Sequence, residues 1–347
     1  MDIFDFLSRV NNLSGISGYE KNVSDVVADI FKEYCDEVTI DSFFNVTGKK
    51  SMGGGRNPRV MLAAHMDEVG MLVTGIDDKG FLSFEGIGLD QRILPGQEVR
   101  VHGRKELLGL IGAKPPHLQK PGEANKAVDI KDLAIDLAMD CDDVKKFVRV
   151  GDTITFKSPV IHMNGNRITG KSLDDRAGVA VMVQAMKELD HLNYGAEVRF
   201  VATTQEELGS RGAQISTYDN LPDVGIAIDV THGDTPDAPK EQTCILGKGP
   251  AVGMGPNMHP KLTHRMMDMA KEYGIAYQPE VIPGHSGTDA WVMQVTRSGV
   301  PTVLVSVPLR YMHTTVETMD LNDIKNAGRL IALFISSLKE ADECFNY

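Results

Sequence analysis

A histidine and an aspartate two residues apart, His65 and Asp67, follow directly on a short apolar stretch at residues 59–64. A continuous apolar run of this length is typical of a buried strand. Side chains two apart on a strand point to the same side, so both should emerge together where the strand ends. A metal-binding imidazole usually has a carboxylate beside it that fixes its tautomer and position. Alone, such a pair is more often structural, so other residues of metal-ligand type must decide between the two interpretations.

Three further apolar stretches end in side chains that can bind a metal. Residues 197–204 run into Glu206 and Glu207, residues 224–228 run into Asp229, and residues 301–307 are followed by His313. In open α/β sheets, ligands bind outside the carboxyl ends of the strands. Strands that end in this way therefore predict one site of imidazole nitrogens and carboxylate oxygens, suited to zinc, cobalt or manganese.

A pair of aspartates, Asp174 and Asp175, precedes a stretch whose apolar residues recur at helical spacing up to Leu189. A helix N-terminus favours acidic groups through its unpaired amides and its dipole, so a helix cap is the plain interpretation of this pair. Likewise, Glu206 and Glu207 could be a solvated pair. Each of these structural interpretations is reasonable by itself. Without a metal site, however, all of them would have to be true together at neighbouring strand and helix ends, and we therefore favour the metal site.

These motifs resemble those of the tetrahedral (TET) aminopeptidases, a dinuclear-metal family that includes glutamyl and deblocking aminopeptidases and members labelled endoglucanase M. The resemblance rests on His65-x-Asp67, Leu-Asp-Asp-Arg-Ala-Gly at residues 173–178, Glu206-Glu207-x-Gly209, Asp229-Val230-Thr231 and Tyr311-Met312-His313. Residues 14–20 (Ser-Gly-Ile-Ser-Gly-Tyr-Glu), 112–117 and 287–290 look like further signatures, so it covers nearly the whole chain in order. One departure is His285-Ser286, where many relatives are richer in glycine.

Carried over to this chain, the resemblance implies a role for each residue of the site. It implies two divalent metal ions per subunit, zinc first with cobalt or manganese as alternatives, and terminal ligands at His65, Glu207, Asp229 and His313. Asp174 is expected to bridge the ions, because its spacing to Gly178 matches that of the bridging aspartate in related metallopeptidases. Glu206 is expected to be the general base, and Asp67 to orient His65.

The order of strand-like and helical stretches predicts an α/β fold with a mostly parallel or mixed sheet covered by helices. The resemblance implies that this is a mixed sheet between helices, like that of zinc exopeptidases. Short β-like pieces punctuated by glycine and proline occupy residues 70–159, and one helix is expected among them at residues 129–138. A turn is expected earlier in the chain, at residues 52–55. We expect residues 1–69 and 160–347 to form the catalytic domain and residues 70–159 an inserted β-rich domain. The resemblance implies that this insert is PDZ-like and builds dimers that assemble into a dodecamer.

Composition narrows the class of protein. The chain has 347 residues, 42% hydrophobic, and a formal net charge of −12, which disfavours a nucleic-acid partner because phosphate binding requires a basic face. The four cysteines lie far apart, which argues against a thiolate zinc site and a disulfide framework and for a reducing compartment. No apolar run approaches the roughly 20 residues of a membrane span, and the N-terminus is typical of a helix start rather than a signal peptide. We therefore expect a cytoplasmic protein with no membrane partner.

The function predicted from these features is a metal-dependent aminopeptidase that hydrolyses N-terminal residues from peptides with a free N-terminus. A bridged metal pair lowers the pKa of bound water and polarises the scissile carbonyl, and a nearby glutamate can move the proton to the leaving amine. A glycoside hydrolase is the rival enzyme class, but it needs two carboxylates and leaves the histidines unexplained. A non-catalytic binding or assembly protein is disfavoured because every proposed ligand and the base are present.

Overall fold

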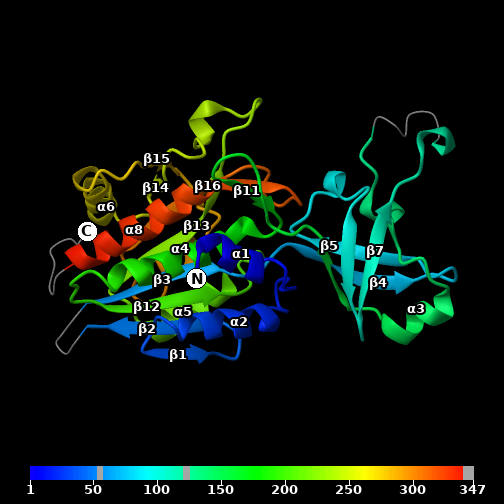
Figure 1. Cartoon of the computed structure of the whole chain (residues 1–347), viewed down its shortest axis with the longest axis horizontal. Helices are drawn as coiled ribbons and strands as arrows, with labels where there is room; N and C mark the ends of the chain where they lie inside the picture. The colour runs from blue at the N-terminus through cyan, green and yellow to red at the C-terminus, as the bar shows by residue number, and fades with distance from the viewer. Residues whose placement is uncertain (53–57, 120–125, 339–347) are drawn as a thin grey trace.

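The computed structural model describes residues 1–52, 58–119 and 126–338, which form a larger α/β body and a smaller β-barrel beside it (Figure 1). The glycines of the turn expected at residues 52–55 lie outside the described residues. None of the helices in the described part of the chain has both the length and the apolar content needed to cross a membrane.

An eight-stranded mixed sheet forms the centre of the larger body, in the order β1-β2-β12-β3-β13-β16-β14-β15. The strands are β1 (Glu37–Ile40), β2 (Val46–Ser51), β3 (Arg59–His65), β12 (Glu197–Thr203), β13 (Val224–His232), β14 (Ala251–Met254), β15 (Gln278–Val281) and β16 (Thr302–Leu309). The central strands β12, β3, β13 and β16 run parallel to one another, whereas β2 and β14 run antiparallel to them. Continuous apolar runs suit these central strands because helices bury both faces of a parallel sheet.

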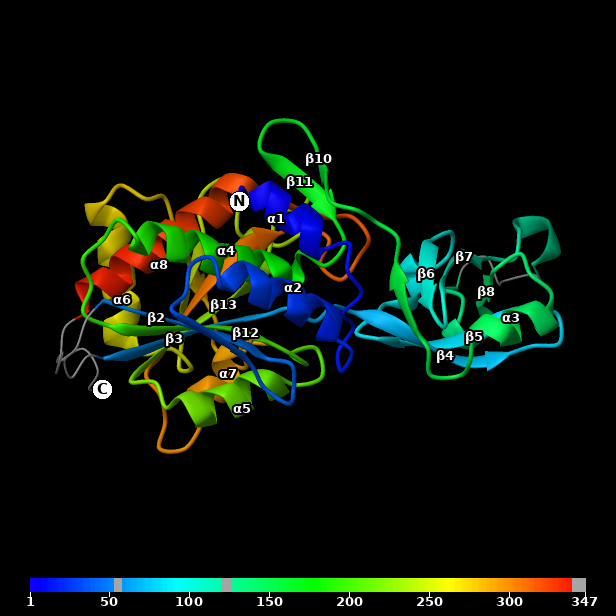
Figure 2. The ribbon, with the colours of Figure 1, turned by 60° about the horizontal axis from the view of Figure 1, so that its bottom comes forward.

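Helices cover the two faces of this sheet (Figure 2). One face carries α1 (Ile3–Val10), α2 (Lys21–Phe31), α4 (Leu173–Leu189), α6 (Pro260–Glu272) and α8 (Leu321–Ser337), and the other carries α5 (Arg211–Asn220) and α7 (Ala290–Met293). Alternate residues of β3 divide between the two apolar clusters. Val60 and Leu62 join the larger one, and Met61 and Ala63 join the smaller one. Because successive side chains of a strand point to opposite faces, both faces of β3 are buried, and β3 lies at the centre of the fold.

The register of the parallel strands brings the predicted site residues to one edge. His65, at the end of β3, pairs with Thr203 at the end of β12. Two residues earlier, Ala63 of β3 pairs with Ala227 of β13. Asp229 therefore lies level with His65 at the carboxyl edge of the sheet.

The smaller part is a closed barrel with strand order β4-β5-β8-β7-β6-β9. The strands are β4 (Gly70–Ile76), β5 (Leu82–Ile87), β6 (Glu98–His102), β7 (Glu106–Gly112), β8 (Ala134–Asp136) and β9 (Thr153–Phe156). Its interior holds an apolar cluster of its own, and closure leaves no free sheet edge. The expected fold class, a mixed sheet between helices with an inserted β-rich domain, is confirmed. The division of the chain at residues 70 and 159 stays a prediction.

The helix expected at residues 129–138 is wrong. A 3₁₀ turn at Ile130–Asp132 is followed there by strand β8, and the only α-helix in the described part of the barrel segment is α3 (Cys141–Phe147). Leu133, Ile135 and Leu137 are buried, whereas the residues between them are not. That period of two is the pattern of a strand with one face on a core, and the barrel interior supplies the core.

A small three-stranded sheet joins the segment between β16 and α8 (Leu321–Ser337) to the segment that leads into α4. Its strands are β10 (Ile161–His162), β11 (Arg167–Gly170) and β17 (Glu317–Asp320), in that order. Gly170 pairs with Glu317. The segment that follows β16 is therefore held beside the two aspartates that open α4.

Candidate metal centre

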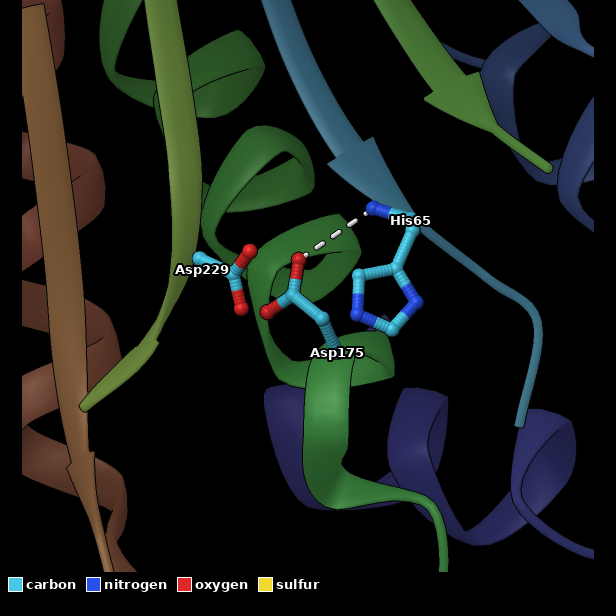
Figure 3. A group of neighbouring side chains, drawn as sticks. All are labelled: His65, Asp175 and Asp229. Atoms are coloured by element: carbon cyan, nitrogen blue, oxygen red, sulfur yellow. Dashed lines mark hydrogen bonds between the residues drawn. The ribbon is translucent and has the colours of Figure 1, made fainter. Parts of the chain in front are cut away.

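Side chains from three elements meet at the carboxyl edge of the central sheet (Figure 3). His65 at the end of β3, Asp229 in β13 and Asp175 at the start of α4 point toward one another. The backbone N–H of His65 donates to Oδ2 of Asp175 at 3.2 Å. All three residues are buried, so two strands and a helix start bring three buried side chains of metal-ligand type together.

Asp174 lies between the two histidines that were predicted as ligands. Its Oδ1 is 3.2 Å from Nε2 of His65, and its Oδ2 is 3.3 Å from Nε2 of His313. The same Nε2 of His313 is 3.1 Å from Oε1 of Glu207. The structure thus brings together the five predicted ligands, which are His65, Asp174, Glu207, Asp229 and His313.

The donor set fits divalent cations. Two groups of possible ligands share His65: one adds Asp175 and Asp229, the other adds Asp174 and Glu207, and the ligand atoms within each group lie within 4.8 Å of one another. Mixed imidazole and carboxylate donors suit zinc, cobalt and manganese. Carboxyl groups outnumber imidazoles, and buried carboxylates without positive partners are costly. Bound divalent ions would balance the negative charge of these carboxylates.

The two neighbouring aspartates differ in what already occupies their oxygens. Asp175 accepts the backbone N–H of His65 through Oδ2 and that of Gly178 through Oδ1, the latter at 3.0 Å. A Cβ at Gly178 would lie 2.3 Å from Asp175 Oδ2, which explains why this position requires glycine. Asp174 instead turns both oxygens to imidazole nitrogens. Asp174 therefore faces both histidines, whereas the oxygens of Asp175 accept backbone amides.

Asp67 ties the imidazole of His65 to the glutamate pair. Its Oδ1 lies 3.4 Å from Nδ1 of His65 and accepts the backbone N–H of Glu206 at 3.0 Å. Its Oδ2 accepts the backbone N–H of Glu207 at 3.3 Å and the hydroxyl of Ser17 at 2.6 Å. Burial alone would raise the pKa of Asp67, but these partners hold the pKa below its ordinary value. Asp67 is thus a buried carboxylate that contacts both the His65 ring and the 206–207 backbone.

The electrostatics of the site reflect crowded carboxylates. Burial raises the pKa of Glu206 to about 8, and the negative charges of Asp289 and Glu207 add to this effect. Burial also holds the pKa of Asp229 well above its ordinary value. Burial alone would lower the pKa of His313, but its bonds to Asp174 and Glu207 raise it to about 11. The raised pKa values of Glu206, Asp229 and His313 thus all favour the protonated forms, because each added proton reduces the net negative charge of the site.

Glu317 joins the segment that carries His313 to the start of α4, which carries Asp174. The sequence analysis did not identify this residue. Its Oε1 accepts the backbone N–H of His313 at 2.9 Å. Its Oε2 accepts the backbone N–H of Leu173 at 2.7 Å and that of Asp174 at 3.2 Å. The only signal in the sequence is an acidic residue four positions after His313, which by itself indicates nothing.

A buried cluster of charges around Glu68 was also missed. Oε1 of Glu68 accepts from Arg176 at 3.2 Å and from the backbone N–H of Gly15 at 3.1 Å, and Oε2 accepts from Lys171 and the hydroxyl of Ser172. Glu68 and Arg176 are almost fully buried. Charged residues are rarely buried unless they are paired. This cluster therefore connects the end of β3 to the chain that carries Asp174.

The loop that departs from the family pattern is ordered by its own contacts. Nδ1 of His285 accepts the backbone N–H of Gly287 at 2.9 Å, and the His285 ring lies 4.1 Å from the ring of Trp291. Further along, Oδ2 of the buried Asp289 accepts the hydroxyl of Thr203 at 2.6 Å. The loop is therefore anchored to the end of β12, beside the site.

Comparisons with known proteins agree with this architecture. The family model described as M42 glutamyl aminopeptidase matches residues 45–330. The chain is 35% identical over 345 residues to the lysyl aminopeptidase of Pyrococcus furiosus, covering 98% of each protein. It is similar to the structure of aminopeptidase APDkam598 from Desulfurococcus kamchatkensis, with a TM-score of 0.90, 37% identity and coverage of 97% and 95% of the two chains.

An oligomeric relative also matches over the full length. The Pyrococcus horikoshii TET1 peptidase, which can assemble into a tetrahedron or a large octahedral shell, is 32% identical with a TM-score of 0.85. The match covers 97% of this chain and 100% of that one. The similarity therefore extends over both the α/β body and the barrel.

Proposed function

Since this chain belongs to the M42 glutamyl aminopeptidase family and is a metal-dependent aminopeptidase, we propose that it removes N-terminal residues from peptides at a centre of two divalent ions. The observation that carries the proposal is the position of Asp174, which turns one oxygen to His65 and the other to His313. On one side, His65 and Asp229 would hold one ion together with Asp174. On the other, Glu207 and His313 would hold the second.

The proposed metals are zinc first, with cobalt or manganese as alternatives, because the donors are imidazole nitrogens and carboxylate oxygens. Bound ions of this kind supply a Lewis acid for the scissile carbonyl and a water of lowered pKa. The chain itself must position these donors and manage the proton. Asp67 does the first by holding the His65 ring and the backbone of the glutamate pair.

We assign the proton transfer to Glu206. Its side chain is partly buried, and its Oε1 accepts the hydroxyl of Ser210 at 3.1 Å. The adjacent Glu207 faces His313 and would be a ligand, whereas Glu206 makes no contact with an imidazole among the described residues. A carboxylate beside the ligands, and not itself facing an imidazole, is placed to take a proton from water and pass it to the leaving amine.

Two other functions fit the site less well. A glycoside hydrolase needs two carboxyl groups placed on either side of a sugar bond, whereas here Asp174 is shared between two imidazoles and Asp175 is bound to backbone amides. A non-catalytic assembly protein would not require the buried ligands and Glu206 at one place. Neither alternative accounts for His65 and His313 meeting across Asp174.

The decisive experiment strips the protein of metal and restores it separately with zinc, cobalt and manganese. Aminoacyl-p-nitroanilides report exopeptidase activity, and N-acetylated versions of the same substrates serve as controls. We expect hydrolysis only with metal and only when the α-amine is free. Cleavage of cellulose oligomers without metal would contradict the aminopeptidase function.

We also propose a homo-oligomer, a dodecamer assembled from dimers, in which residues 70–159 make subunit contacts and residues 1–69 and 160–347 form the catalytic part. The barrel lies beside the larger body with its own core (Figure 1). On β7, Leu108 and Leu110 are 54% and 52% exposed, and exposed apolar patches commonly mark protein contacts. In a closed shell the sites would face an interior, which restricts substrates to peptides.

The compartment is proposed from the cysteines. Cys35, Cys141 and Cys244 are free thiols. Widely spaced free thiols are typical of a reducing compartment. We therefore propose the cytoplasm as the location.

A further inference from the structure

Glu20 is a buried carboxylate without a positive partner in the described part of the chain. Its exposed fraction is 0%. Oε1 accepts the backbone N–H of Gly18 at 2.8 Å and that of Gln205 at 3.1 Å, and Oε2 has no hydrogen-bond partner among the described residues. Burial, followed by the negative charge of Asp67, raises the pKa of Glu20 to about 7. A buried acid in so unfavourable a place calls for a reason.

The reason lies in the turn at residues 205–207, here called the 205–207 turn. Its three consecutive backbone N–H groups all donate to buried carboxylates: Gln205 to Glu20, and Glu206 and Glu207 to Asp67. Gln205 adopts φ +55°, in the left-handed backbone region that residues other than glycine rarely adopt. Such a backbone persists only where surrounding contacts hold it, and Glu20 makes the contact at the residue that turns the chain into Glu206.

The N-terminal segment that carries Glu20 is itself fastened to the site. The backbone N–H of Glu68 donates to the carbonyl of Gly15 at 3.0 Å, and the Gly15 N–H donates back to the Glu68 carboxylate at 3.1 Å. Further on, the hydroxyl of Ser17 donates to Asp67 at 2.6 Å. The segment thus runs from the residues that follow β3 to the 205–207 turn. This gives a place to the motif at residues 14–20, which the metal ligands do not use.

We propose that Glu20 is a positioning residue for the reaction: by accepting the Gln205 amide it holds the 205–207 turn in the conformation that aims Glu206 at the substrate. The proposal rests on the assignment of Glu206 as the base. It makes Glu20 an acceptor that acts through geometry, and its negative charge is dispensable. Displacing a reacting group by about 1 Å can cost on the order of 100-fold in rate, so the effect should fall on kcat.

Two substitutions at this position separate reach from charge. Glu20→Gln keeps the length of the side chain and an oxygen that can accept both amides, but it removes the charge. Glu20→Asp keeps the charge but shortens the side chain by one methylene, so that it no longer reaches Gln205. We expect Glu20→Gln to keep kcat within about 3-fold of wild type, and Glu20→Asp to lower kcat about 10- to 100-fold. KM and metal content, measured by elemental analysis, should stay near wild type in both.

A matched control lies elsewhere in the fold. Asp323, in the first turn of α8, is also buried, and its carboxylate accepts the backbone N–H groups of Gly247 and Gly249 at 2.6 and 2.8 Å. Asp323→Ala removes a comparable pair of bonds. It should lower the melting temperature but leave kcat unchanged, which separates loss of stability from loss of positioning.

A double-mutant cycle with Glu206→Gln tests whether the two residues act together. If Glu20 acts through Glu206, Glu20→Asp should cost less than about 3-fold in kcat once Glu206 is already glutamine. An unchanged penalty in that background, an equal loss in Glu20→Gln and Glu20→Asp, or loss of metal from Glu20→Asp would each overturn the proposal. Failure of the base assignment shows itself separately, as near wild-type turnover by Glu206→Gln alone.

Discussion

The carboxylate of Asp174 is shared between two histidines, with Oδ1 3.2 Å from Nε2 of His65 and Oδ2 3.3 Å from Nε2 of His313. The histidines come from segments far apart in the chain, one at the end of β3 and one after β16. A single side chain thus couples both halves of the proposed metal centre. The first prediction follows from this arrangement.

Asp174→Ala should lose most of both metal ions, because a bridging carboxylate serves each of them. Elemental analysis of the purified variant measures the loss directly. Asp229→Ala is the matched control, since a terminal ligand should weaken one ion more than the other. Two tightly bound ions in Asp174→Ala would mean that Asp174 is not the bridge, and Asp175 would become the candidate.

Glu206→Gln should keep near-normal metal content while kcat on a peptide substrate falls by at least ~10³, because the amide has the size of the acid but cannot accept a proton. Single-turnover kinetics and metal analysis on the same sample check both parts. Glu207→Gln should behave in the opposite order and lose metal affinity first, since Glu207 faces His313. Hydrolysis by Glu206→Gln at a near wild-type rate would assign the base to another residue.

Breaking the buried charge cluster should destabilise the fold. Glu68→Gln leaves Lys171 and Arg176 buried without their counter-ion, and removal of one partner of a buried ion pair typically costs about 3–5 kcal/mol. Melting temperature at fixed protein and metal concentration is the measurement. The exposed pair Lys21–Asp25 provides the control, because Lys21→Ala should cost at most about 1 kcal/mol. Equal effects of the two substitutions would show that the cluster contributes nothing beyond a surface pair.

The assembly prediction concerns the apolar face of β7. We expect light scattering in metal-replete buffer to show a large homo-oligomer, with a mass near that of twelve chains for the proposed dodecamer. Replacing Leu108 and Leu110 by aspartate should shift the protein to smaller species while metal content is kept, because an apolar contact cannot form across new charges. A wild-type protein that is only monomeric would contradict the proposal, and an unchanged mass in the double variant would place the contact elsewhere.

The sequence by itself was sufficient for the features that depend on local pattern. Apolar runs that end in His65 and Asp229 predicted strands whose ends share an edge, and the strand register confirms that these residues lie level. The choice of Asp174 over Asp175 as the bridge came from the family resemblance and stays a prediction. The prediction of a helix at residues 129–138 was wrong because Leu133, Ile135 and Leu137 follow the two-residue period of a strand. These three side chains are buried by the barrel interior, which forms only when strands from other parts of the segment pack together.

Only the tertiary structure revealed the groups that hold the site in place. In the sequence, Glu20 ends the motif at residues 14–20 and Glu68 follows Asp67. No local pattern shows that these two residues or Glu317 are buried, because acidic residues are usually solvated. Each is buried here because segments far apart meet around it: Glu20 accepts an amide from Gln205, 185 positions away, and Glu317 accepts one from Leu173, 144 positions away. Local patterns specify which strands and helices form and which side chains end them. Hydrogen bonds between distant segments form only when those elements pack, so no local pattern records them.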